Sequence, residues 1–258
     1  MPDSPAYAIL GRGRWAHRTR DVLTGEGRRC VFIEDARRET IETDSDYKQR
    51  LTKRMTDSGS HIAWLCTLPG SHVPLLVEAA IGAGLHVIAE KPWPYSPNQT
   101  RALQDLAAAT GRQVGVHFEY CLLDAVEKWR NQFDRGAGLQ FGGRFHLRGP
   151  DRLGIPATDN LGCHLLAIRE YAVPESGLAA ISCEYERADD RRVWLEKNHQ
   201  EIAPIDFLGS KEPIIQRYVA KFEGGLEGTS FPFDLEFAAR TAAAVSAWKQ
   251  RGEKPGDP

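Results

Sequence analysis

The sequence lacks long hydrophobic runs, a regular cysteine pattern and a marked excess of charge, and each absence excludes a class of protein. No apolar stretch reaches the roughly 18 residues of a membrane span, so no membrane partner is expected. The first residues lack the basic-then-apolar layout of a signal peptide. Five scattered cysteines without C-x-x-C spacing favour reduced thiols in a cytoplasmic protein and predict no metal site. A net charge of −2 gives no reason to expect a nucleic-acid partner.

The first 120 residues alternate short apolar runs with helix-like stretches. Continuous apolar strands in such an alternation predict an α/β fold with a doubly wound parallel sheet. Helices are expected over 71–85 and 96–111, the second with Ser96 as N-cap, Pro97 at the first helical position and Gly111 as its stop. The expected strands are 6–10, 29–33, 61–67, 86–90 and 113–118.

After about residue 120 the pattern changes to strands in succession followed by helices. This order predicts a smaller α+β domain with a mainly antiparallel sheet of about four strands. We therefore expect a Rossmann-type domain over 1–120 and a second domain over 121–258. The second domain should contain helices over 122–133, 212–225 and 234–251 and strands over 142–149, 179–186, 192–198 and 201–209.

A glycine loop, "GRGRWA", directly follows the first expected strand and opens a helix. Gly11, Gly13 and Ala16 fit the pattern G-x-G-x-x-A, in which the glycines allow a tight turn and a close approach of the backbone to a pyrophosphate. The free N–H groups and the dipole of the helix start favour an anion at this place. The loop predicts a dinucleotide site, to which Arg12, Arg14 and Trp15 of the same loop also belong.

Two carboxylates, Glu34 and Asp35, end the second expected strand and lie 23 and 24 residues beyond Gly11. A carboxylate there hydrogen-bonds the adenosine ribose of NAD, which favours NAD as the cofactor. Arg37 and Arg38 follow at once, so the sequence leaves NADP open as an alternative.

The fourth expected strand ends on Glu90-Lys91-Pro92, which brings a carboxylate and an ammonium to the rim of the sheet. With the glycine loop and the block "IAWLCTLPGSHVPLLVEAAIGAGLHVIAEKPWPYS", this motif resembles the Gfo/Idh/MocA oxidoreductase family over nearly all of residues 7–120. The resemblance implies an NAD(P)-dependent oxidoreductase. It implies that Glu90 contacts the cofactor and that Lys91 is the catalytic lysine, which holds or protonates the substrate oxygen. It also places the loop of Thr67, Leu68, Pro69 and His72 beside the cofactor.

The resemblance resumes weakly at "DNLGCHLLAI", residues 159–168. The family carries a D-x-x-x-H element there, whose histidine is a general acid/base assisted by the aspartate. His164 matches the histidine, whereas Asn160 occupies the aspartate position. Asp159 is one residue early and would point about 100° away on a helix. Because an asparagine carries no charge to raise the basicity of an imidazole, this departure questions standard alcohol oxidation.

His117 and Tyr120 close the fifth expected strand, at the face where the substrate should lie. His117 is expected to line the substrate site together with Asn160 and Asp159, and Tyr120 is a candidate proton donor. An aromatic residue at a domain junction also commonly serves packing only.

The sequence thus predicts an enzyme that moves hydride between a nicotinamide and a C–O or C=N carbon of a small polar substrate, such as a sugar, a cyclitol or a cyclic imine. The alternative is a nucleotide-binding protein, or a non-redox enzyme, that keeps NAD(P) without net turnover. Asn160 and a second domain shorter than the family norm both favour this alternative. A homo-oligomer remains open.

Overall fold

The computed structural model describes residues 4–34, 36, 39, 41–148, 154–186, 189–208 and 210–252. The chain forms two compact units. Unit 1 comprises residues 1–117 and 215–239, and unit 2 comprises residues 118–214 and 240–258.

Unit 1 is built on a five-stranded parallel sheet in the order β2-β1-β3-β4-β5. The predicted doubly wound sheet is confirmed, and each strand lies within one of the predicted apolar runs. Because all five strands are parallel, their carboxyl ends meet at one edge, where α/β proteins bind ligands. The strands are β1 (Tyr7–Leu10), β2 (Cys30–Ile33), β3 (Ile62–Leu65), β4 (His86–Glu90) and β5 (Val114–His117).

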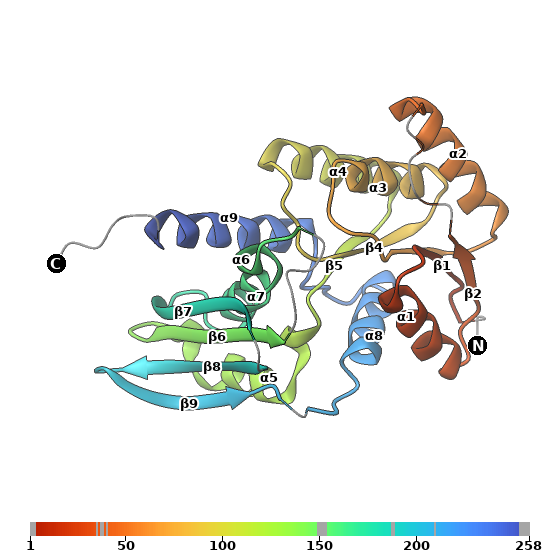
Figure 1. Ribbon diagram of the computed structural model, residues 1–258. Coiled ribbons are helices and arrows are strands. Elements are labelled where there is room, and N and C mark those ends of the chain that lie inside the picture. Colours follow the sequence, from red (N-terminus) through yellow and green to blue (C-terminus); the bar gives the residue numbers. More distant parts are fainter. Residues whose placement is uncertain are drawn as a thin grey trace. The chain divides into compact units, whose positions relative to one another are not determined.

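Helices cover both faces of this sheet, with α2, α3 and α4 on one side and α1 and α8 on the other (Figure 1). The start of α4 follows the sequence signals, since Ser96 and Gln99 form a reciprocal capping box, and Gly111 ends the helix at φ 64°. The helices are α1 (Arg14–Gly25), α2 (Asp44–Asp57), α3 (His72–Gly82), α4 (Pro97–Thr110) and α8 (Ile214–Leu226).

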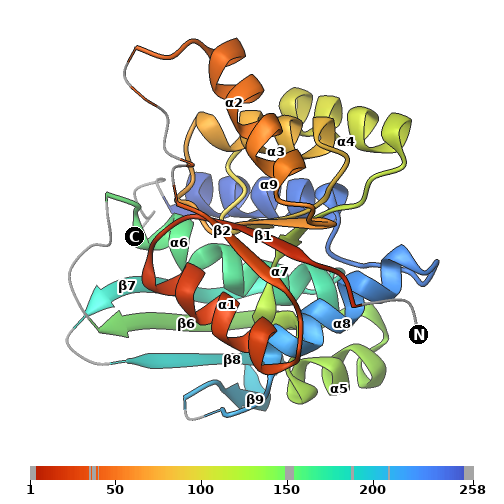
Figure 2. The same ribbon diagram turned by 90° about the vertical axis from the view of Figure 1, so that its right-hand side faces the viewer.

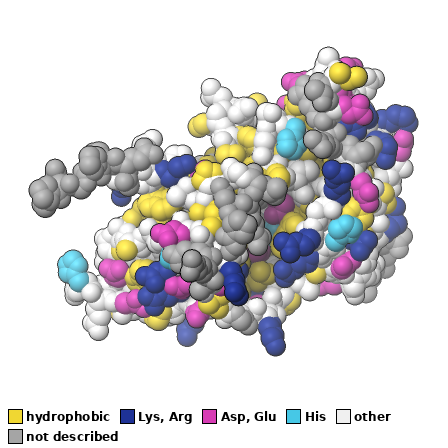
Figure 3. Space-filling model, viewed as in Figure 1, with side chains coloured by type: hydrophobic (Ala, Val, Ile, Leu, Met, Phe, Trp, Pro, Cys, Tyr) yellow, Lys and Arg dark blue, Asp and Glu magenta, His cyan; other side chains and the backbone are white. Residues whose placement is uncertain are grey.

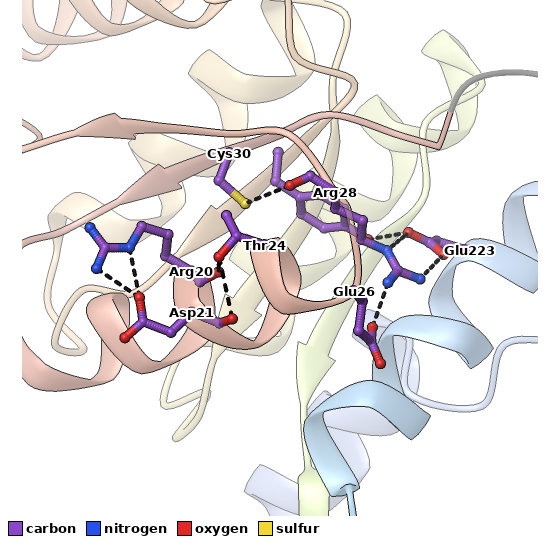
Figure 4. Close-up of polar contacts among 8 residues, drawn as sticks. Arg20, Asp21, Thr24, Glu26, Arg28, Cys30 and Glu223 are labelled. Atoms are coloured by element: carbon purple, nitrogen blue, oxygen red, sulfur yellow. Dashed lines mark hydrogen bonds and ion pairs between the residues drawn. The ribbon is translucent and has the colours of Figure 1, made fainter.

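An ion-paired network ties α8 to the beginning of the chain (Figure 4). The Arg28 guanidinium donates through Nε and Nη2 to the two carboxylate oxygens of Glu223 on α8, at 2.8 and 2.7 Å, and also pairs with Glu26. The Tyr7 hydroxyl donates to Glu223 Oε1 at 2.7 Å, and burial followed by the Glu223 charge raises the pKa of Tyr7. Beyond α8, Val116 donates its N–H to Phe233 O at 2.9 Å, which adds this later segment to the edge of β5.

The sequence analysis assigned all of residues 121–258 to a second domain, whereas residues 215–239 lie in unit 1. The physical reason is long-range pairing. Glu223 of α8 pairs with Arg28 near the start of the chain. The rings of Tyr218 and Phe231 pack against Gly115 of β5, so closely that a Cβ at Gly115 would lie 2.9 Å from the Tyr218 hydroxyl. No local pattern in the sequence reports such a return of the chain.

Unit 2 contains a four-stranded sheet in the order β7-β6-β8-β9 (Figure 2). The pair β6–β7 is parallel, and the pairs β6–β8 and β8–β9 are antiparallel, so the predicted mainly antiparallel sheet is confirmed. The strands are β6 (Gln140–Arg148), β7 (Gly177–Glu186), β8 (Asp190–Lys197) and β9 (Gln200–Asp206).

One face of this sheet packs on helices. Phe141 contacts Trp129 of α5 (ring centroids 6.4 Å apart), and a Cβ at Gly143 would meet Leu165 of α7 at 2.7 Å. Cys163, Leu166 and Val245 form a further buried cluster between α7 and α9. The helical elements are η1 (Glu119–Leu122), α5 (Asp124–Gln132), η2 (Asp134–Gly136), α6 (Ala157–Asn160), α7 (Gly162–Ala172) and α9 (Leu235–Gly252), the last beginning in unit 1.

Acidic and basic side chains are interspersed over the face shown in Figure 3, in keeping with the small net charge of −2. Within the described residues, no helix is long and apolar enough to cross a bilayer. The same residues contain no group of three or more His, Cys, Asp or Glu side chains placed to hold a metal ion.

Candidate functional site

The two glycines of the loop after β1 differ in what the protein itself requires of them. Gly11 has φ +131°, and a Cβ there would lie 2.6 Å from the carbonyl oxygen of Cys66, so the fold demands glycine. Gly13, the N-cap residue of α1, has ordinary angles (φ −77°, ψ 169°), and a Cβ there would meet no protein atom within 4 Å. The open space at Gly13 is therefore available for the close approach of a ligand to the backbone.

These residues fit a dinucleotide. Ala16 is buried where α1 packs on the sheet, and Gly13 leaves the N-terminus of a 12-residue helix open to an anion. In the adjoining loop after β3, Thr67 Oγ1 is buried and has no hydrogen-bond partner within the described protein, so it is available to a bound group. Arg12, Arg14 and Glu34 are exposed beside the loop, whereas Asp35, Arg37 and Arg38 lie outside the described residues.

The loop after β3 is fastened by Tyr95. The Tyr95 hydroxyl donates to Gly70 O at 3.1 Å and accepts from Gly70 N at 3.3 Å. Gly70 lies against the His72 ring, because a Cβ at Gly70 would meet His72 Nδ1 at 2.8 Å. Burial lowers the pKa of His72 and raises the pKa of Tyr95 to about 12, so both groups are neutral at pH 7. Leu68 and Pro69 belong to the same loop, and Leu68 is exposed.

Glu90, at the end of β4, accepts hydrogen bonds from three elements on a single carboxylate oxygen. Its Oε1 lies 2.6 Å from Trp15 Nε1 on α1, 2.9 Å from Trp64 Nε1 on β3 and 3.1 Å from His117 Nδ1 on β5. Trp64 and His117 are fully buried, and their rings meet edge to face at 5.1 Å. The parallel sheet thus brings Trp64 and His117 onto one carboxylate oxygen, and helix α1 brings Trp15.

The Glu90 carboxyl is held in its charged form. Burial acts to raise its pKa, but the His117 charge and the hydrogen bonds from His117, Trp64 and Trp15 outweigh burial, so the pKa lies below its ordinary value. Lys91 follows directly, is half-buried and precedes Pro92 through a cis peptide bond. The rim of β4 therefore carries a fixed carboxylate and an ammonium next to it in sequence.

In unit 2, His164 on α7 is buried among aromatic rings. Its ring lies 4.7 Å from that of Tyr120 in an edge-to-face arrangement and 6.1 Å from that of Phe145. The Tyr120 hydroxyl accepts a hydrogen bond from Arg191 Nη1 on β8 at 3.1 Å. The structure therefore brings together His164 and Tyr120, two residues predicted from the sequence, and adds a guanidinium that the sequence analysis missed.

Asn160 and Asp159 contact other residues at the start of this region. Asn160 Nδ2 donates to the Tyr185 hydroxyl on β7 at 2.9 Å, and that hydroxyl donates in turn to Ile155 O at 3.2 Å. Asp159 Oδ1 is paired with Lys249 Nζ on α9 at 3.0 Å. The Asp159 charge is thus offset by a lysine.

The sequence analysis missed Trp64, Tyr95, Arg191 and Tyr185 as neighbours of the candidate residues. Trp64 lies in the predicted strand "HIAWLCT" and is paired with Ile88 of β4. Glu90 lies two residues after Ile88 and therefore on the same face of the sheet as Trp64. Strand alternation could have predicted this neighbour once strands β3 and β4 were taken to be adjacent and parallel. Arg191 and Tyr185 had no comparable signal, because they depend on the register of β6 with β7 and β8.

Comparison with known proteins supports the cofactor assignment. Residues 24–118 match the model of the Gfo/Idh/MocA family, described as an oxidoreductase family with an NAD-binding Rossmann fold. The predicted resemblance is confirmed over this segment, as is the prediction of an NAD-binding oxidoreductase domain. No curated protein matches the sequence.

Solved structures share the fold across both units. The UDP-N-acetylglucosamine 3-dehydrogenase GnnA from Acidithiobacillus ferrooxidans is 13% identical with a TM-score of 0.77, covering 94% of this chain and 96% of that one. The WlbA dehydrogenase from Bordetella pertussis, solved with NADH and UDP-GlcNAcA, is 13% identical with a TM-score of 0.73 (98% and 100% covered). GenD2 from gentamicin A biosynthesis, solved with NAD, is 15% identical with a TM-score of 0.75 (99% and 96% covered). At these identities the likeness establishes the fold.

Proposed function

We propose that this protein is an NAD-dependent oxidoreductase acting on a small polar substrate, because residues 24–118 match the model of the Gfo/Idh/MocA oxidoreductase family. One observation carries the proposal: Gly13 is a glycine that the fold does not require, at the open N-terminus of α1. A pyrophosphate bound there explains the glycine, because a side chain at this position would block its approach to the backbone. Lys91, at the carboxyl edge of the same sheet, is the expected catalytic lysine.

Bound NAD supplies the hydride acceptor or donor, and the protein handles the proton and the charge. The Lys91 ammonium stabilises negative charge on the substrate oxygen or donates a proton to it. His164 takes up the hydroxyl proton on oxidation and returns it on reduction, and Tyr120 beside it is a second proton donor. Asn160, Asp159 and His117 are the proposed substrate-site residues.

The structures of similar fold favour a sugar hydroxyl as the reacting group, since one is a UDP-N-acetylglucosamine dehydrogenase and another was solved with UDP-GlcNAcA. Reduction of a cyclic imine is the second candidate within this reaction class. It requires a proton donor and no strong base, which suits an asparagine at position 160.

We propose a modest preference for NAD over NADP, because the exposed Glu34 carboxylate would repel a 2′-phosphate. Arg12, exposed in the glycine loop, acts in the opposite direction. Comparable or tighter binding of NADP at matched salt would reverse this preference.

A second function class has a specific observation in its favour. The Asp159 charge is offset by Lys249, and Asn160 carries none, so the charge assistance that the family provides for its histidine is weakened here. A protein that retains NAD without net turnover would tolerate this change.

The deciding experiment mixes the purified protein with NAD and a panel of sugar alcohols and nucleotide sugars, or with NADH and carbonyls or imines. Turnover is followed at the NADH absorbance band. Turnover of any member supports the oxidoreductase. Tight cofactor binding without turnover across the panel favours the second class, and absence of cofactor binding removes both.

The five cysteines are free thiols in the structure, which supports a reducing compartment, and we propose the cytoplasm. Cell fractionation tests this location, and sedimentation of the purified chain tests a homo-oligomer.

A further inference from the structure

Three hydrogen-bond donors surround one carboxylate oxygen of Glu90. Three donors, Trp15, Trp64 and His117, converge on Oε1, whereas a carboxylate oxygen offers two lone pairs. Such charge-assisted bonds are the strong ones in proteins. Because this oxygen is already saturated by the protein, it has no capacity left for a cofactor hydroxyl.

The three donors lie on different elements of unit 1. Trp64 and His117 lie on β3 and β5, the two strands next to β4, so their bonds join groups that the sheet already places together. Trp15 lies on α1, two residues after Gly13, and its bond is the shortest of the three at 2.6 Å. It therefore connects the start of the glycine-loop helix to the strand end that precedes Lys91.

The start of α1 has little else to fix it. Its N-cap is Gly13, which has no side chain to bond the first N–H groups, and its first turn carries no acidic residue. The Trp15 ring also contacts the Arg18 guanidinium, 5.4 Å from its centroid, and the His117 ring at 5.8 Å. Trp15 thus connects to Glu90 a helix end that has no side-chain cap.

We propose that Glu90 is a positioning residue that acts through Trp15: the charged carboxylate holds the indole, and the indole fixes the first turn of α1 for the pyrophosphate. This inference rests on the proposed use of NAD. It assigns to Glu90 Oε1 a role through the protein, separate from any contact that the second oxygen makes with the cofactor. The hydrogen bond between Trp15 and Glu90 then fixes the position of the first turn of α1 relative to the end of β4.

The test compares two variants that each delete one indole hydrogen bond in unit 1. Trp15→Phe removes the donor to Glu90, and Trp93→Phe removes the bond from Trp93 Nε1 to Thr100 Oγ1 at 3.0 Å. NADH affinity is measured by titration calorimetry, and folding is checked by thermal unfolding. Trp15→Phe should weaken NADH binding by about tenfold, the worth of one charge-assisted bond, and Trp93→Phe by less than about twofold.

A third variant separates loss of the bond from loss of an indole–cofactor contact. Glu90→Gln leaves Trp15 intact and replaces a charged acceptor by a neutral one, so NADH binding should weaken by roughly threefold. In the double variant, Trp15→Phe should cost less than it does in the wild type, because the bond is already weakened.

Unchanged NADH affinity in folded Trp15→Phe overturns the inference while leaving the cofactor assignment intact. Full additivity of Trp15→Phe and Glu90→Gln also overturns it, since the two residues would then act independently. Failure of the wild-type protein to bind NADH overturns the proposed function and the inference together.

Discussion

The two candidate catalytic side chains stand in surroundings of opposite character. Lys91 follows a carboxylate held in charged form by hydrogen bonds from three elements of unit 1. His164, in unit 2, lies edge to face with Tyr120 and near Phe145. In unit 1 a fixed charge organises the site, whereas in unit 2 aromatic packing does. Substitutions that remove charge should therefore act more strongly in unit 1.

The largest effect is expected at Gly13. Gly13→Val should lower NADH affinity at least a hundredfold, because the side chain fills the space left for the pyrophosphate, while costing only about 1 kcal/mol of stability at the N-cap. Gly11→Ala is the matched control and should instead destabilise the fold, given its φ of +131° and the nearby Cys66 oxygen. Calorimetric titration and urea unfolding measure the two effects. NADH affinity of wild-type strength in folded Gly13→Val would refute the loop assignment.

The next effect compares the two catalytic candidates directly. Lys91→Ala should reduce turnover by roughly a hundredfold with cofactor affinity nearly unchanged, as expected for loss of a positioned charge and proton donor. His164→Ala should reduce turnover less, because Asn160 and the Asp159–Lys249 pair have weakened its assistance. Steady-state kinetics on the identified substrate measure both. Near-normal turnover of Lys91→Ala would show that the family mechanism does not operate here.

Removal of a carboxylate charge should also affect the stability of the units unequally. Glu223→Gln should lower the free energy of unfolding by about 2 kcal/mol, because it weakens a bidentate pair with Arg28 and the bond from buried Tyr7. Asp159→Asn removes a more exposed pair with Lys249 in unit 2 and should cost below about 0.5 kcal/mol. Urea titration of both variants decides. Equal losses would contradict the contrast between the units.

The smallest effect is a pH dependence in unit 1. Burial, with Arg112 and His61, lowers the pKa of His86, whose Nδ1 accepts the N–H of Gln113 at 2.9 Å and so must stay neutral. A lowered folded-state pKa means that its stability contribution is present above about pH 6.5 and is lost as the pH falls below that value. The loss should stay under about 1 kcal/mol, because the group is only half-buried. Thermal unfolding between pH 7.5 and about 5.5 measures it. If the stability of His86→Asn falls equally steeply with decreasing pH, the effect belongs to other titratable groups.

Unit 1 was largely predictable because its signals are local. Each strand is a short apolar run, α4 carries its own capping box and stop, and parallel order brings the strand ends to one edge. Glu90 and Lys91 were found for that reason. The partners of Glu90 were not, since three donors from three elements meet only once the strand order and the α1 packing exist.

Unit 2 was predictable in outline only. The four strands follow from their patterns. The Arg191–Tyr120 and Asn160–Tyr185 bonds join a strand to a helical element, so they depend on strand register and on helix packing, which no short motif encodes. The Arg28–Glu223 pair spans 195 positions, so its formation depends on tertiary structure alone.

That last pair has a consequence for the order in which the chain acquires its structure during synthesis. Arg28 and Tyr7 belong to the first elements to leave the ribosome, yet their common partner, Glu223, is among the last. The hydrogen bond from Val116 N–H on β5 to Phe233 O likewise forms only after residue 233 has been synthesised. Unit 1 therefore completes its fold only after residues 118–214 of unit 2 have been translated. Until then, one face of the nascent Rossmann sheet lacks α8 (Figure 1).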